Sequence, residues 1–320
     1  TGPEAVLDFP VLETIRDEGA TDYIAISLPR SEGGIYLTSI AVDRAEGFLP
    51  EEIERLIALR PALALVTEIH ARRQTMRGLL DLYLGPEAGR RVYAGDIRRG
   101  EGHGIRSVLW MCDLRGFTIM SDHMPLQDLI GELNAYFEAV TGPIHAHGGE
   151  VLKFIGDAVL GIFRIENDHD LEDVCERALD AAELAVANMR ILNHRLERYG
   201  KSPLDFSIAL HVGEAMYGNV GAHDRLDFTV IGPAVNLCAR LEALAAKLGE
   251  KIVCSAEFGE ASREKMRSLG FHSLHNVEAL VSAAETTYVF EIFCLHNKFV
   301  TFPISNRVSQ PFSVGGVRML

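Results

Sequence analysis

The chain has 320 residues and a formal net charge of −14, and this length fits one large domain or two smaller ones. The acidic balance argues against a protein that binds nucleic acid or an anionic membrane through its general charge. A nucleotide ligand remains compatible with it, because a local group of basic side chains and metal ions can bind phosphate. The five cysteines are scattered without zinc spacing and favour a reduced, cytoplasmic protein. No apolar run is long enough to span a bilayer.

Residues 1–49 contain two runs with strand character, at 23–28 and 35–42. The Gly-containing sequence 31–34 between them suits the loop of a β-hairpin. This segment is too short for an independent core. Two interpretations remain open: it resembles the last part of a GAF-type sensor domain, or it is a small dimerising β-extension.

A long helix is predicted to begin at Pro50, which fits the first turn of a helix, and to end at Gly85. Pro61 lies inside this pattern and predicts a kink or the start of a second helix. The residues that follow Gly85 are rich in Gly and Arg and indicate a connector. We therefore expect 50–104 to be a dimerising signalling helix with its connector.

Apolar residues on this helix follow the three-four spacing of a coiled-coil seam at Leu56, Leu59, Leu63 and Val66. The same register then meets His70, Arg73 and Arg77, so the predicted seam is poor in its middle. Either this is a solvated helix face, or it is a weak dimer helix that can change its geometry.

From residue 105 to 293 the pattern predicts an α+β domain. The expected elements are a strand at 107–113, a helix at 125–146, a hairpin at 150–163, a helix at 170–198, strands at 206–212, 215–221 and 227–231, and a helix at 233–248. Strand-helix-strand-strand-helix-strand is the order of a ferredoxin-like βαββαβ core. Residues 294–320 show no helical period and form a C-terminal tail without an assigned role.

The first chemical motif is a strand that ends in Asp113 and runs into a loop containing Gly116, Phe117 and Thr118. A carboxylate beside such a loop can hold a metal ion, while backbone N–H groups of the loop meet phosphate. Magnesium bound with a nucleotide takes one or two carboxylates plus phosphate oxygens.

A second carboxylate, Asp157, follows Gly156 at the tip of the predicted hairpin, with Lys153 four residues earlier. Taken alone, this hairpin is equally well explained as a surface turn. If its strands neighbour the strand that ends in Asp113, the two carboxylates together suit a magnesium–nucleotide complex.

In the third motif a strand turns into a helix at Gly232-Pro233, and Asn236 and Arg240 share one face of that helix. An Asn can orient a hydroxyl group, and an Arg can hold a phosphoryl oxygen. The alternative is a pair of surface residues without a function.

The three motifs together resemble the class III nucleotidyl cyclases. The pattern Asp-x-x-Gly-Phe-Thr, then Lys-x-x-Gly-Asp, then Gly-x-x-Val-Asn with an Arg four residues later occurs here in order, over about 105–293. The resemblance implies the palm-like cyclase fold, preceded here by the signalling helix and the β-rich segment. It also implies an adenylate cyclase that converts ATP to 3′,5′-cyclic AMP and pyrophosphate.

The resemblance further assigns roles. Asp113 and Asp157 would hold two Mg²⁺ ions, for which Mn²⁺ can substitute, and the Leu114 carbonyl would add a ligand. Backbone N–H groups near Phe117 and Thr118 would meet the terminal phosphates. Asn236 would orient the ribose, and Arg240 would stabilise the charge that develops at the α-phosphoryl group.

Lys153 and Thr229 are the expected base-recognition residues. A Lys donates to adenine N1 and a Thr hydroxyl accepts from N6, whereas guanine would need an acceptor at the position of Lys153. Thr229 resembles the class IIIb subgroup, in which stimulation by bicarbonate is often found. His275 stands where the family often has a phosphate-binding Lys, and a neutral His would bind phosphate less well.

In the family the site is formed by a homodimer, with the metal carboxylates from one chain and the base-recognition and catalytic residues from its partner. A monomer is therefore expected to be inactive. The alternatives are a non-catalytic regulatory pseudo-cyclase, a guanylate cyclase or a diguanylate cyclase. The last fits poorly, because Val151 and Leu152 replace the acidic and aromatic residues of its hairpin motif.

Overall fold

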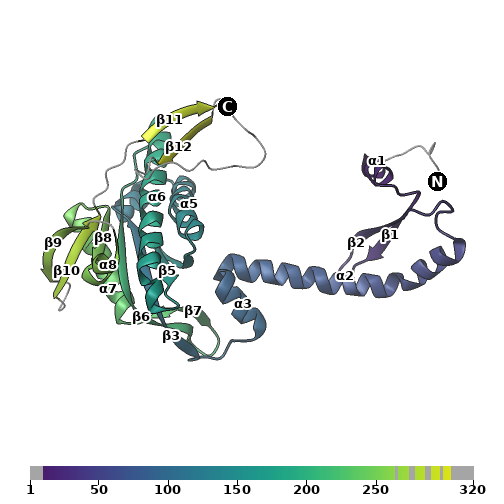
Figure 1. Cartoon of the computed structure of the whole chain (residues 1–320), viewed down its shortest axis with the longest axis horizontal. Helices are drawn as coiled ribbons and strands as arrows, with labels where there is room; N and C mark the ends of the chain where they lie inside the picture. Colours follow the sequence, from purple (N-terminus) through teal and green to yellow (C-terminus); the bar gives the residue numbers. More distant parts are fainter. Residues whose placement is uncertain (1–9, 264–265, 274–277, 285–289, 296–297, 304–320) are drawn as a thin grey trace. The chain divides into compact units, whose positions relative to one another are not determined.

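The computed structural model describes residues 10–263, 266–273, 278–284, 290–295 and 298–303. The chain divides into two compact units, Thr1–Ile97 and Arg98–Leu320. Figure 1 shows the ribbon, with the N-terminal unit in purple and blue. In the described part, no helix has the length and apolar character required to cross a membrane.

The N-terminal unit is a hairpin packed on a long helix. Its elements are α1 (Pro10–Asp17), β1 (Asp22–Pro29), β2 (Ile35–Val42), α2 (Pro50–Leu84) and α3 (Pro86–Ala94). The expected hairpin and helix are both present, and β1 pairs with β2 in antiparallel register. The predicted connector after Gly85 contains a helix of its own, α3, because Pro86 occupies its first turn.

Helix α2 continues through Pro61 as one element of 35 residues, so the predicted start of a second helix is wrong. Its neighbours Leu63 and Ala64 pack against Ile26 and Leu28 of β1, and this tertiary packing holds the helix across the proline. The predicted seam is split as a consequence. Leu56 and Leu63 face the hairpin of the same chain, whereas Leu59 and Val66 are exposed.

The second unit is an α+β domain. Its strands are β3 (Gly102–Leu114), β4 (Glu150–Ile155), β5 (Ala158–Arg164), β6 (Phe206–Gly221), β7 (Leu226–Ile231), β8 (Ile252–Ser255), β9 (Met266–Ser273), β10 (Glu278–Ala284), β11 (Phe290–Leu295) and β12 (Lys298–Pro303). Its helices are α4 (Phe117–His123), α5 (Leu126–Ala146), the 3₁₀ turn Asp168–Asp170, α6 (Leu171–Arg198), α7 (Pro233–Leu248) and α8 (Ala256–Ala261).

Eight strands form one sheet in the order β4-β5-β3-β6-β8-β10-β9, with β7 paired to β6. All pairs are antiparallel except β6 with β8. The first four strands and helices α5 and α6 form the expected ferredoxin-like βαββαβ core. The predicted strands 206–212 and 215–221 are one strand, β6, which pairs with the whole of β3.

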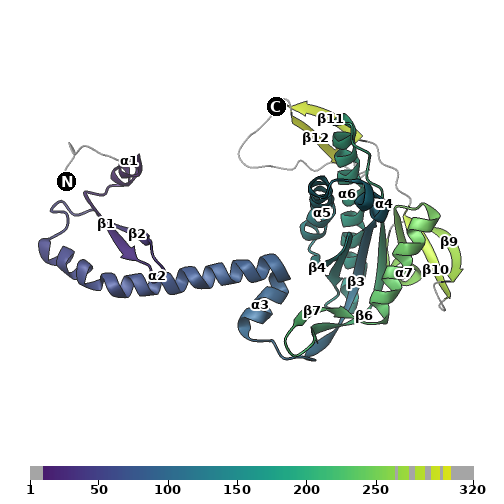
Figure 2. The ribbon, with the colours of Figure 1, turned by 180° about the vertical axis from the view of Figure 1, so that it is seen from behind.

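Alternation along β3 separates the two faces of this sheet. Val108, Trp110 and Cys112 join the main core with α5 and α6, whose helices lie over this face in Figure 1. Helix α7 packs on the opposite face of the sheet, where the Cys238 thiol donates to the carbonyl oxygens of Leu109 and Ala209 at 3.5 Å each. Figure 2 shows α7 beside β6. Asp113 therefore belongs to the α7 face.

Candidate functional site

The two predicted metal-binding carboxylates lie side by side. β5 pairs with β3 so that Val159 stands opposite Cys112, and this register brings the hairpin tip at Asp157 to the end of β3. The Asp157 carboxyl lies close enough to that of Asp113 to raise its pKa. Sheet pairing thus joins two residues that are far apart in the sequence.

This site is acidic and partly dehydrated. Burial and the neighbouring Asp157 carboxyl raise the pKa of Asp113 to about 8, and the charge of Glu242 adds to the effect. Glu242 is a buried residue of α7, accepts a hydrogen bond of 2.7 Å from the Ser207 hydroxyl, and has its pKa raised by burial. A cation between the two aspartates would relieve this repulsion.

Beyond Asp113 the chain turns sharply into α4. Gly116 adopts a left-handed φ of 74°, which favours glycine. Phe117 and Thr118 are the first residues of α4, so their N–H groups have no acceptor within the helix. The Leu114 N–H donates to Asp113 at 3.1 Å, which holds the carboxylate against the start of the loop.

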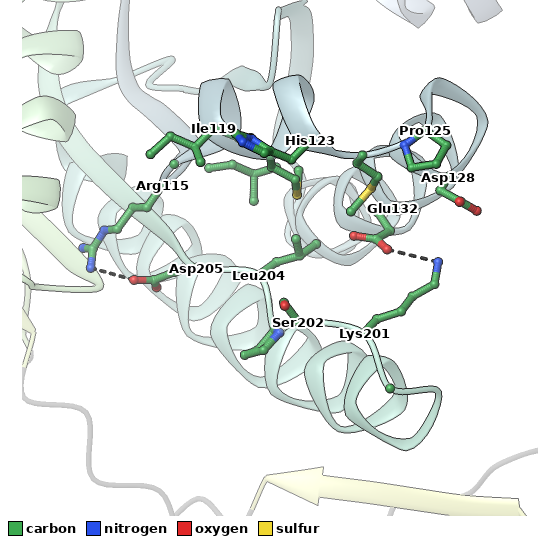
Figure 3. A pocket seen from close by; sticks show the side chains of 16 residues that line it. Arg115, Ile119, His123, Pro125, Asp128, Glu132, Lys201, Ser202, Leu204 and Asp205 are labelled. Carbon is green, nitrogen blue, oxygen red and sulfur yellow. Dashed lines mark hydrogen bonds and ion pairs between the residues drawn. The ribbon is translucent and has the colours of Figure 1, made fainter.

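The loop residues Leu114, Arg115 and Gly116 also line a pocket of about 700 Å³, shown in Figure 3. Two ion pairs lie in its lining: Arg115 with Asp205 at 3.2 Å, and Lys201 with the buried Glu132 at 3.0 Å. Arg115 also donates to the Ala245 carbonyl at 3.2 Å and to the Glu250 carbonyl. One side chain therefore ties the Asp113 loop to the end of α7.

The predicted base-recognition residues form a second group. The Lys153 ammonium makes an ion pair with Asp227, which lies two residues before the buried Thr229 on β7. Residues two apart on a strand share a face, so Asp227 links Lys153 on β4 to the Thr229 strand. Asp227 is not among the residues predicted from the sequence, because a lone carboxylate on a strand carries no signal of its partner.

The predicted catalytic pair lies on α7. Cys238 and Leu241 are buried, and Asn236 is exposed, so the amphipathic helix presents the Asn236 side to solvent. Its first turn approaches β6 closely: a Cβ added to Gly213 would lie 2.5 Å from the Cβ of Ala234. Glycine at 213 is thus required for this spacing.

Among the described residues, no group of three or more His, Cys, Asp and Glu side chains is arranged to hold a metal ion. The donor set nevertheless fits a hard cation that is shared with a ligand, because Asp113 and Asp157 supply two carboxylates. The structure brings Asp113 next to Asp157, and it separately brings Lys153 next to the strand that carries Thr229. His275 lies outside the described residues. Glu242 was also missed, since its position beside the aspartates depends on how α7 packs.

Residues 106–291 match the family model described as the adenylate and guanylate cyclase catalytic domain. An uncharacterized protein of Mycobacterium tuberculosis is 32% identical over 203 residues, which cover 62% of this chain and 36% of that protein. An adenylate cyclase of Anabaena cylindrica is 33% identical over 162 residues, covering 49% of this chain and 31% of that protein. The chain thus spans about a third of the length of these curated relatives.

Solved structures share the fold. A bacterial light-regulated adenylyl cyclase matches with a TM-score of 0.59 and 24% identity, covering 71% of this chain and 65% of that one. The guanylyl cyclase Cya2 matches with a TM-score of 0.50 and 26% identity, covering 57% of this chain and 93% of that one. Similar structures therefore carry names of both nucleotide specificities.

Proposed function

Because the chain belongs to the family of adenylate and guanylate cyclase catalytic domains, we propose that it is an adenylate cyclase that forms 3′,5′-cyclic AMP and pyrophosphate from ATP. The observation that carries this proposal is the pair of adjacent carboxylates, Asp113 and Asp157, together with Lys153 next to the Thr229 strand. The first pair suits a metal-bound triphosphate, and the second suits adenine.

In this proposal Asp113, Asp157 and the Leu114 carbonyl bind two Mg²⁺ ions, or Mn²⁺ in their place. When bound, these ions lower the pKa of the ribose 3′-hydroxyl and hold the triphosphate. The first N–H groups of α4, at Phe117 and Thr118, have no acceptor within the helix, which supports a role for them in binding the terminal phosphates. The raised pKa of Asp113 supports this assignment, because a cation bound between the two carboxyl groups would offset their repulsion.

Base choice follows from hydrogen-bond chemistry. Lys153 can only donate and matches adenine N1, and the Thr229 hydroxyl can accept from the N6 amino group. Asp227 holds the ammonium group of Lys153 on the Thr229 side. The Lys–Thr combination supports the class IIIb subgroup, and a response to bicarbonate follows from that assignment.

The proposed enzyme works as a homodimer. Asp113 and Asp157 act from one chain, and the partner chain contributes its own copies of the base-recognition residues, Asn236 and Arg240. Asn236 orients the ribose, and Arg240 stabilises charge on the α-phosphoryl group. Segment 1–49 acts as a sensor remnant or β-extension, and 50–104 carries its signal to the catalytic domain.

Turnover of ATP and GTP, each with Mg²⁺ and with Mn²⁺, tests the proposal directly. We expect cyclic AMP as the main product and a kcat/KM for ATP at least about tenfold above that for GTP, since a mismatched buried polar group costs about 1–3 kcal/mol. The Asp157→Ala variant serves as the inactive control. A preference for GTP would overturn the base assignment. Tight ATP binding without any cyclic product would identify a pseudo-cyclase.

A further inference from the structure

Arg115 fixes the loop that follows Asp113 to the start of β6. Its backbone N–H donates to the Asp205 carbonyl at 2.8 Å, and its Nη1 pairs with the Asp205 carboxylate at 3.2 Å, an ion pair that is drawn in Figure 3. Its Nε donates to Ser207 Oγ at 3.4 Å. Ser207 stands opposite Asp113 in the β3–β6 ladder, so these contacts hold the loop beside the proposed metal-binding carboxylate.

The same guanidinium group reaches the C-terminal end of α7. Its Nη2 donates to the Ala245 carbonyl at 3.2 Å and to the Glu250 carbonyl. The Ala245 carbonyl lies in the last turn of α7 and also accepts from the N–H groups of Gly249 and Glu250. A cation is favoured there, because the helix dipole places partial negative charge at this end. Only 18% of the Arg115 side chain is exposed, so water competes weakly for these bonds.

A second link joins the same two parts of the chain. Glu242 is a buried residue of α7 that accepts from the Ser207 hydroxyl at 2.7 Å, and Ser207 is also bonded to Arg115. Arg240 lies on the same helix, about one and a half turns before Ala245. The loop after Asp113 and the helix that carries Arg240 are therefore held in one fixed arrangement.

We infer that Arg115 is a positioning residue for two active sites at once. Through the loop it sets the position of Asp113 in one site of the dimer, and through α7 it sets the position of Arg240 in the other. The assignment of these two parts to different sites rests on the proposed function. The role requires arginine, because its planar guanidinium group donates in several fixed directions, whereas the ammonium group of a lysine acts from a single point.

Mixed dimers with a single working site separate the two effects. When Arg240→Ala chains are mixed with Asp157→Ala chains, the working site takes its carboxylates from the first chain and Arg240 from the second. Arg115→Lys in the first chain should raise the Mg²⁺ concentration for half-maximal cyclic AMP formation about tenfold, because the loop beside Asp113 is displaced. The same change in the second chain should lower kcat about tenfold at saturating Mg²⁺ and leave the Mg²⁺ requirement unchanged.

The matched control is Arg195→Lys, at an exposed position in the last turn of α6, which should change neither value in either chain. Thermal unfolding of each chain checks that the variants are folded at the assay temperature. A general loss of stability would produce the same effect from both placements, so an identical effect would overturn the inference. The absence of any effect from Arg115→Lys would also overturn it.

Amide hydrogen exchange reads the same contacts without nucleotide turnover. In the full chain with Arg115→Lys alone, the N–H groups of the loop and those of Gly249 and Glu250 should exchange about tenfold faster, since the arginine no longer holds these segments. The centre of β5 is the internal reference and should keep its rates. Unchanged exchange at the end of α7 would overturn the role of Arg115. If exchange is faster but the mixture without the Arg115 change forms no cyclic AMP, the shared site of the proposed function is wrong, and with it the assignment to two sites.

Discussion

At the level of single residues, the raised pKa of Asp113 should make the stability of the metal-free protein depend on pH. Its folded pKa is raised to about 8, while an unfolded Asp titrates near 4. Between these two pH values the folded state therefore binds more protons than the unfolded state. The protonated carboxyl makes its whole contribution to the free energy of unfolding below about pH 4, and this contribution is lost as the pH rises towards 8.

We expect urea unfolding in EDTA to show this loss between pH 5 and pH 8, and Asp113→Asn to remove most of it. Asp122→Asn, at an exposed position, is the control and should follow the parent protein. Added Mg²⁺ should stabilise the parent at pH 8 but not the Asp113→Asn variant. If the free energy of unfolding of Asp113→Asn depended on pH as it does in the parent protein, the carboxyl pair would not be the cause of the loss.

The ion pair between Lys153 and Asp227 yields a second residue-level prediction. Lys153→Ala removes the proposed donor for adenine and should lower kcat/KM for ATP about ten- to a hundredfold. Asp227→Asn removes only the anchor of the ammonium group, so a loss of a few fold is expected. Because Asp227 is largely exposed, its substitution should change stability by less than about 1 kcal/mol. A larger loss of kcat/KM for ATP in Asp227→Asn than in Lys153→Ala would contradict the proposal that Lys153 contacts adenine and that Asp227 only positions Lys153.

The motif residues themselves could be predicted from sequence, because a Gly-Asp turn, a strand-terminal Asp and an Asn-Arg helix pair each carry a local signal. Asp227 and Glu242 carry none. Each acquires its neighbour only when β4 approaches β7, or when α7 packs on the sheet.

At the level of elements, the spacing between α7 and β6 depends on Gly213. Gly213→Ala would force its new methyl group against Ala234 and displace the first turn of α7, which carries Asn236. We expect a loss of stability of about 1–3 kcal/mol from overpacking and a fall of about tenfold or more in kcat. Thermal unfolding and steady-state kinetics measure the two effects.

Gly131→Ala on α5 is the matched control, since no atom lies within 4 Å of its added Cβ. It should keep activity and gain up to about 1 kcal/mol from helix propensity. Wild-type kcat in Gly213→Ala would show that α7 tolerates displacement.

The element order of the catalytic domain was predictable, because apolar periodicity and turn residues mark each strand and helix. Two errors have physical causes. The expected strands 206–212 and 215–221 leave Gly213 and Glu214 between them, yet pairing with the whole of β3 keeps β6 continuous. Pro61 suggested a new helix, yet packing against the β1–β2 hairpin holds α2 together.

At the level of the whole molecule, the proposed shared site makes two inactive chains complementary. Asp157→Ala chains mixed with Arg240→Ala chains should regain activity, because the heterodimer contains one site with both defects and one with neither. Random exchange predicts recovery of roughly a quarter of wild-type activity, since half of the dimers are mixed and each has one intact site. The measurement is cyclic AMP formation after mixing, with subunit exchange verified by fluorescence energy transfer. Demonstrated exchange without recovery would exclude a site shared between chains.

Strand β6 contacts both parts of the proposed site within one chain. Near its beginning Ser207 stands opposite Asp113, and near its end Gly218 stands opposite Thr229. In a symmetric pair these two ends serve different substrate molecules. If a nucleotide orders one end of the strand, we expect the continuous hydrogen-bonded ladder to change the affinity of the other pocket for its nucleotide. The two sites of the proposed dimer would then not bind ATP independently, and the saturation curve for ATP would depart from that of two equal, independent sites.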